Sequence, residues 1–370
     1  MLFIKTDDLN VGMRLARPVY NKNGVLLYER NSKLTVQGVN SIKNFGIIGI
    51  FILEPAEPVP PMTRDDIAFE RFQTMEVFAI EEELKKVIST KKTDKLQIIV
   101  ADIIRNYGRL DRKINFIQSL RSAEDRIYKH SLNVAILCSV MCHKLNIPLK
   151  KQTEIISAAI LHAVGKLSIK HSEAKDSEDF KKRERHAKQI GFPIIEDATI
   201  INPGIKRICV QAQRGMNDWD QKIHSNNRMT DGANILLVAE FFDEMTAMQF
   251  DKNPESEVLA IKTLLSNADY FDHEVVMSLI HSINILNPGV CVELNTGEKG
   301  LVISENYNNI LRPMVLGFHS NRIYDLSNHR VFSDLEIKDI MKTMDNRHKM
   351  NIEVLKNYVV AEDIPVFEEA

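Results

Sequence analysis

The stretch that decides the fold is residues 158–166, which read Ala-Ala-Ile-Leu-His-Ala-Val-Gly-Lys. His162 stands inside an apolar run that a glycine closes, so the pattern predicts a buried helix over 152–164. His130 and His186 lie in two other stretches with helical periodicity. A lone core histidine usually makes an ordinary hydrogen bond, but several histidines on bundled helices can converge on a metal ion.

Composition limits the class of protein. The chain has 370 residues, of which 44% are hydrophobic and 26% charged, as in a soluble globular protein with two or three domains. The formal net charge of -2 leaves no general basic field for a nucleic-acid polymer or an anionic membrane. The cysteines form no CxxC pair, the first residues lack a signal-peptide pattern, and no apolar run approaches the ~20 residues that span a bilayer. These features predict a cytoplasmic protein.

The chain is predicted to comprise five segments. The helical period dominates from residue 63 onward, whereas runs near both ends are rich in β-branched residues and turn formers. Prolines crowd residues 54–61 and predict a stiff extended linker. The predicted fold is mainly α and comprises a small β-rich α/β module (1–55), a Pro-rich linker with connecting helices (56–109), a helical domain (110–289), a small antiparallel β extension (290–336), and a C-terminal helix with an acidic tail (337–370).

Individual elements follow from the same pattern. Helices are predicted at 35–45, 95–107, 128–145, 152–164, 231–248, 255–268, 273–286 and 334–349. Strands are predicted at 24–28, 47–53, 290–294, 301–304 and 314–318, with a turn at 295–297. The helical segments would form a bundle between two small modules.

The run from His162 to Lys166 resembles the HD-x-G-K motif of the HD superfamily and, more narrowly, of HD-GYP domains, which are bacterial cyclic di-GMP phosphodiesterases. The resemblance extends to the family's first helix histidine (His130), its H-x4-G element (His186 and Gly191) and its V-A-D-x-F-D-A-L-T helix (238–246). Both flanking modules also resemble segments that accompany HD-GYP domains. The resemblance implies an HD-type helical bundle and metal-dependent hydrolysis of a phosphodiester.

Several positions depart from the family pattern. Ala163 stands where the family has an aspartate that bridges two metals, and Glu240 replaces an aspartate ligand while keeping an oxygen donor. The family's H-H-E element becomes residues 212–214, Ala-Gln-Arg, and its G-Y-P becomes residues 220–222, Asp-Gln-Lys. The resemblance leaves one set of metal ligands, which would hold one divalent ion (iron, manganese or zinc) or none: His130, His162, His186 and Glu240.

Three more residues are candidates for ligand binding. Lys166 would reach a phosphate, as in the family, or lie solvated at a helix end, where a cation is favourable. Arg214 would occupy the space of the missing metals or bind a phosphate through its guanidinium. Trp219, predicted in a loop, would stack on a guanine base or fill the emptied pocket.

An intact scaffold around an eroded metal site predicts a non-catalytic HD-GYP protein of bacterial signalling. It would bind cyclic di-GMP or a signalling protein, and its flanking modules would suit a homodimer; no nucleic-acid polymer and no membrane are expected as partners. The alternative is a weakly active metal-dependent phosphohydrolase, a cyclic di-GMP phosphodiesterase with a mononuclear site. A third hypothesis is a structural adaptor that binds neither metal nor nucleotide.

Overall fold

The computed structural model describes residues 2–47, 49–53, 62–119, 121–122, 124–168, 177–224, 228–248 and 254–341. It divides into two compact units. One is a helical unit of residues 64–284 together with 18–28, and the other contains the remaining N-terminal and C-terminal residues. The predicted linker at 54–61 and the acidic tail lie outside the described residues.

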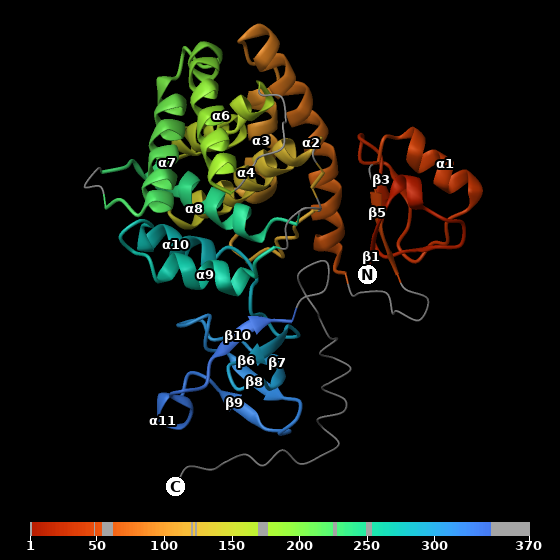
Figure 1. The fold of residues 1–370 in the computed structure, drawn as a ribbon, viewed down its shortest axis with the longest axis vertical. Helices are drawn as coiled ribbons and strands as arrows, with labels where there is room; N and C mark the ends of the chain where they lie inside the picture. Colours follow the sequence, from red (N-terminus) through yellow and green to blue (C-terminus); the bar gives the residue numbers. More distant parts are fainter. Residues whose placement is uncertain are drawn as a thin grey trace. The chain divides into compact units, whose positions relative to one another are not determined.

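The helical unit confirms the predicted mainly α fold (Figure 1). Six of its helices coincide with predicted ones, with ends shifted by a few residues. Its elements are α2 (Arg64–Thr90), α3 (Leu96–Tyr107), α4 (Arg126–Lys144), α5 (Leu149–Leu161), the short 3-10 helix η2 (Val164–Ser168), α6 (Ser177–Ala198), α7 (Pro203–Gln221), α8 (Asp231–Thr246), α9 (Glu257–Leu265) and α10 (His273–Ile280). None of the described helices has the length and apolar composition needed to cross a bilayer.

Helices α2 and α3 pack onto the bundle. Helix α2 contacts α3 and α4, and α3 contacts α4 and α5. Ile80 and Leu84 of α2 and Ile103 of α3 are fully buried as a result. The compact helical unit therefore begins at residue 64, close to where the helical period of the sequence begins, and it includes helices that precede the predicted domain boundary at 110.

Helix α4 lies at the centre of this unit. Between Ile127 and Cys142 every residue except Lys129 is buried, and α4 packs against α2, α5 and α8. A helix that is buried on all sides lies in a core. Helix α8 is similar, with a buried run from Ile235 to Asp243. Polar side chains on α4 and α8 therefore face each other inside the protein.

Two glycines bring α6 against η2. A β-carbon added to Gly165 would overlap the carbonyl oxygen of Ala187 and lie 2.5 Å from the backbone nitrogen of Gly191. One added to Gly191 would lie 3.0 Å from the backbone nitrogen of Gly165. Only hydrogen fits between the two backbones at this crossing. The contact fixes the part of α6 that lies next to His162, the residue that ends α5.

The N-terminal module contains a three-stranded antiparallel sheet in the order β1 (Leu2–Lys5), β5 (Gly49–Leu53), β2 (Arg14–Leu15). The predicted helix is α1 (Val36–Asn44), which Thr35 caps by accepting a hydrogen bond from the Gly38 amide at 3.0 Å. A hairpin of β3 (Val19–Tyr20) and β4 (Leu26–Tyr28) is grouped with the helical unit. The short 3-10 helix η1 (Thr6–Asp8) follows β1.

The C-terminal segment forms a five-stranded antiparallel sheet in the order β10-β6-β7-β8-β9. Its elements are β6 (Cys291–Leu294), β7 (Lys299–Ser304), β8 (Met314–Gly317), β9 (Ile323–Asp325), the short helix α11 (His329–Phe332) and β10 (Ile337–Ile340). The predicted turn at 295–297 is confirmed, with Gly297 at a φ of 83°. The predicted helix at 334–349 is wrong where the chain is described, because residues 337–340 pair with β6 and bury Ile337 and Ile340.

We expect Gly165→Ala to lower the free energy of unfolding of the helical unit by about 3 kcal/mol, because rigid backbone atoms block the added methyl group. Gly204→Ala is the matched control, since its methyl group would meet only side-chain ends, those of Asn202 at 3.1 Å and Glu154 at 3.3 Å. We expect that control to cost about 1 kcal/mol or less. Urea unfolding followed by circular dichroism measures both variants, and equal losses would contradict the crossing described above.

Candidate functional site

Three potential metal ligands meet in the core of the helical unit. His130 comes from the second turn of α4, His162 from the end of α5, and Glu240 from α8. Among the described residues, this is the group of His, Cys, Asp and Glu side chains whose ligand atoms lie close enough to share an ion, all within 4.8 Å of one another. The three residues are 5%, 4% and 1% exposed. The site is closed to bulk water.

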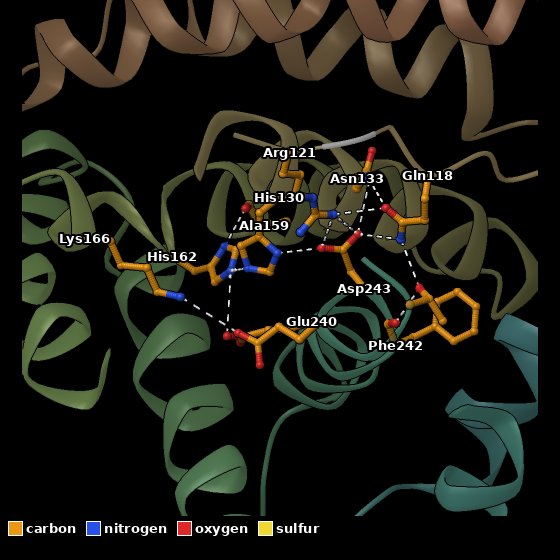
Figure 2. A network of polar contacts seen from close by, with 12 residues as sticks. Gln118, Arg121, His130, Asn133, Ala159, His162, Lys166, Glu240, Phe242 and Asp243 are labelled. Carbon is orange, nitrogen blue, oxygen red and sulfur yellow. Dashed lines mark hydrogen bonds and ion pairs between the residues drawn. The ribbon is translucent and has the colours of Figure 1, made fainter. Parts of the chain in front are cut away.

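Asp243 fixes the ring of His130 (Figure 2). Its Oδ2 lies 2.6 Å from His130 Nδ1, and Arg121 Nη2 lies 2.6 and 2.7 Å from its two carboxylate oxygens. Gln118 and Asn133 donate to Oδ1 at 3.0 and 3.2 Å. Burial alone would raise the pKa of Asp243, but Arg121 and His130 hold it well below its usual range. Asp243 is therefore ionised, and His130 donates its Nδ1–H to it.

The ring of His162 is fixed in the same manner. Its Nδ1 lies 2.7 Å from the carbonyl oxygen of Ala159, which can only accept, so Nδ1 carries the proton and Nε2 has a free lone pair. Burial lowers the pKa of His162 to about 3, and the ring is neutral at pH 7. Its Nε2 lies 3.0 Å from His130 Nε2. The two rings therefore meet through their Nε2 atoms, while Nδ1 of His130 faces Asp243.

Lys188 of α6 completes the site. Its ammonium forms an ion pair with a Glu240 oxygen, and the two residues are 5% and 1% exposed. Burial opposes the charged form of Lys188, yet Glu240 raises the lysine's pKa above its ordinary value. Burial likewise opposes the charged form of Glu240, but Lys188, followed by His162 and His130, lowers the carboxyl pKa to about 2. Both groups are charged, as a buried pair requires.

The geometry of the donors suits a single ion, but the lysine takes its place. Ligand atoms about 2.1 Å from one tetrahedral zinc ion lie about 3.4 Å apart. The two imidazole Nε2 atoms are 3.0 Å apart, and His162 Nε2 is 3.9 Å from Glu240 Oε1. That same Glu240 oxygen is bound to the ammonium of Lys188. The residues therefore do not fit a metal while this ion pair is formed.

His186 was also predicted as a ligand, but the structure does not bring it together with the other three residues. It is exposed on α6, outside the cluster. The reason is helical geometry, since residues two apart on an α-helix project about 200° from each other. Lys188 points into the core, so His186 points away from it.

Arg214 and Trp219 also lie elsewhere than predicted. Arg214 is exposed on α7, so it does not fill the metal position. Trp219 belongs to α7 and not to a loop. Its ring centroid is 5.4 to 5.5 Å from three aromatic rings and 3.3 Å from the Lys222 ammonium. The three rings are those of Phe241, Tyr270 and Phe271.

Lys166 lies at the edge of the site, in η2. Its ammonium forms an ion pair with Glu184 of α6 and lies 3.9 Å from Glu244 of α8. Burial would raise the pKa of Glu184, but Lys166 lowers it overall. The side chain of Lys166 is 11% exposed. A phosphate would reach this ammonium only by competing with Glu184.

The sequence analysis missed Lys188 and the network around Asp243, although signals for both exist. Asp243 follows Glu240 by three residues and therefore lies on the same face of its helix. Lys188 shares a helical face with Gly191 and Ile195, three and seven residues later. A lysine on a buried face needs a charge partner. The basic residues around it made this stretch resemble a solvated surface.

Comparison with known proteins supports the resemblance. Residues 115–275 match the family model of the HD domain. The chain is 22% identical over 210 residues to the cyclic di-GMP phosphodiesterase PA4108 of Pseudomonas aeruginosa. The aligned residues cover 55% of this chain and 50% of that protein. The chain thus spans about half the length of this curated relative.

A solved structure, Bd1817, an HDG"Y"P protein from Bdellovibrio bacteriovorus, is also similar. It shares 15% identity and a TM-score of 0.43 over 75% of this chain and 97% of that chain. The match to the HD domain, which covers all the residues of the buried cluster, agrees with the helical unit described above. The chain is therefore similar to HD-GYP proteins, and its match to the HD domain lies at residues 115–275.

Proposed function

We propose that this chain is a non-catalytic HD-GYP protein that acts in bacterial signalling by binding a ligand or a partner protein. The observation that supports this most directly is the buried ion pair between Lys188 and Glu240. The carboxylate that would hold a metal is already neutralised by an ammonium of the protein itself. Ala163, whose methyl group offers no donor, stands where the family has its bridging aspartate.

The chemistry of phosphodiester hydrolysis supports the same proposal. Two-metal sites stabilise both the attacking and the leaving oxygen of an in-line displacement. Here three donors converge within the described part of the chain, and one of them is paired with a lysine. A lysine with a raised pKa remains protonated, so it does not act as a base toward water. The core site therefore stabilises the fold and leaves function to the surface.

Cyclic di-GMP is the first ligand to test, because the curated relative is a cyclic di-GMP phosphodiesterase. Lys166 and Arg214 are the cations proposed to contact its phosphates. Trp219 is less suited to stack on a base, since aromatic neighbours and Lys222 already contact its ring. Its position supports the interpretation that it fills space. A signalling protein is the other candidate ligand.

A second candidate function is a weakly active phosphohydrolase with one metal. The convergence of His130, His162 and Glu240 favours it, since two histidines and a glutamate form known zinc sites. In that case the metal would have to displace Lys188 from Glu240. The two candidates differ in metal content and in turnover.

We expect untagged protein, purified without chelator from metal-replete cells, to contain well below one equivalent of metal. We also expect it to leave cyclic di-GMP intact, because Lys188 neutralises Glu240 and no second metal position exists among the described residues. Elemental analysis and chromatography of the nucleotide measure both. One equivalent of metal that disappears in His162→Ala, together with turnover, would favour the phosphohydrolase.

The affinity for cyclic di-GMP tests the role of Lys166. Lys166→Ala should weaken binding about tenfold, the loss expected for one charge-assisted hydrogen bond. Glu184→Gln should strengthen binding several-fold, because it removes the carboxylate that competes for the ammonium. Lys151→Ala is the control, since that lysine of α5 is 55% exposed and likewise pairs with a glutamate, Glu154, at 2.7 Å. Titration calorimetry decides, and an unchanged affinity in the first two variants would exclude Lys166 as a phosphate contact.

A further inference from the structure

Glu240 needs a positive charge, and the structure shows where it comes from. Asp243, the other buried carboxylate of α8, is matched by Arg121 and His130. Glu240 is 1% exposed, and its nearest histidine, His162, is neutral and 3.9 Å away. Within the described residues, the ammonium of Lys188 forms the close ion pair with Glu240. A carboxylate this deeply buried is costly to ionise unless a cation accompanies it.

We infer that Lys188 is an internal substitute for a metal ion, and that removing its ammonium opens a zinc site formed by His130, His162 and Glu240. This inference rests on the proposed function, because it assumes that the HD domain is non-catalytic and explains why its core holds a lysine. The chemical class of the ligand is a divalent ion that accepts two imidazoles and one carboxylate.

The two imidazoles are already arranged as zinc ligands would be. The Nδ1 atom of each ring faces an acceptor. For His130 the acceptor is Asp243, and for His162 it is the carbonyl oxygen of Ala159. Both Nε2 atoms face the same point, 3.0 Å apart. Histidine ligands of metals are commonly oriented by such a partner on the other ring nitrogen. An ion between the two rings would meet both Nε2 atoms, because each Nδ1 is already engaged by its own acceptor.

The position of Lys188 depends on the crossing of α6 with η2. Lys188 precedes Gly191 by three residues and so lies on the same side of α6. Because Gly191 touches Gly165 backbone to backbone, this side of α6 comes close to the helix end that carries His162. The long lysine stem then reaches from α6 to Glu240 on α8. A shorter or uncharged side chain at residue 188 would leave this carboxylate unpaired.

The test compares Lys188→Met with the natural chain. Methionine keeps much of the volume of the stem and removes the charge. Untagged Lys188→Met should bind one equivalent of Zn²⁺ at least about a hundredfold more tightly than the natural chain, the factor that corresponds to an unpaired buried charge. Zn²⁺ should also raise the melting temperature of the variant by several degrees and leave that of the natural chain unchanged. Titration calorimetry and thermal unfolding with added ZnCl₂ provide the two readouts.

Two further variants serve as controls. Lys182→Met changes an exposed lysine of the same helix and should gain no zinc affinity. Lys188→Met with Glu240→Gln removes both charges, so it should fold without zinc and fail to bind it. If Lys188→Met unfolds without zinc, the double variant shows that the fold tolerates methionine, and refolding of the single variant by Zn²⁺ would support the inference.

Three results would overturn it. They are a folded Lys188→Met that gains no zinc affinity, a Lys188→Met that zinc does not refold while the double variant is folded, and a natural chain that binds zinc as tightly as the variant. None of these results requires cyclic di-GMP turnover. Hydrolysis by the natural chain would refute the proposed function instead, so the two failures are distinguishable.

Discussion

The rest of the structure depends on the need to neutralise two carboxylates buried on one face of α8. Glu240 and Asp243 are 1% and 0% exposed, and each is charged. An isolated buried charge costs several kcal/mol, comparable with the whole stability of a domain. The protein meets this cost with partners from three other segments: the cations Arg121, from the chain before α4, and Lys188 of α6, and the hydrogen-bonding ring of His130 of α4. The ion pairs therefore specify which elements must meet in the core.

The arrangement also shows how the bundle is held together around these residues. In a metal site, a ring such as that of His130 needs a fixed orientation, and Asp243 supplies it here. The same hydrogen bond stabilises the bundle when no ion is bound, because it joins α4 to α8 across the core. A bundle that binds a metal ion and one that does not would differ only in the cation beside Glu240. Residues that orient a ligand and residues that hold helices together are then the same residues.

Local rules predicted most of the fold, since the helices of the HD domain follow from apolar periodicity and from glycines at their ends. The family resemblance, and not these local rules, pointed to His130, His162 and Glu240, which the structure brings together. The local rules failed where the outcome depends on the direction of one side chain. His186 and Lys188 differ by two positions in a basic run, and only the packing of Gly191 on Gly165 decides which faces the core. Residues 337–340 form a strand because β6 offers an edge for pairing, which no pattern within those residues reveals.

An ammonium and a divalent ion solve the same charge problem but not the same chemical problem. Lys188 supplies one positive charge and three N–H donors, and it has no open coordination position. A zinc ion in its place would lower the pKa of a bound water to near 7 and create a nucleophile, whereas a protonated lysine does not bind water in that way. The ammonium also engages Glu240 in an ion pair, so this carboxylate oxygen is occupied while that pair is formed. Under the inference above, the ammonium would preserve the electrostatics of the core without supplying a reactive metal-bound water. Selection on such a site would then act through the stability and surface of the bundle, and this is the behaviour expected of a binding module.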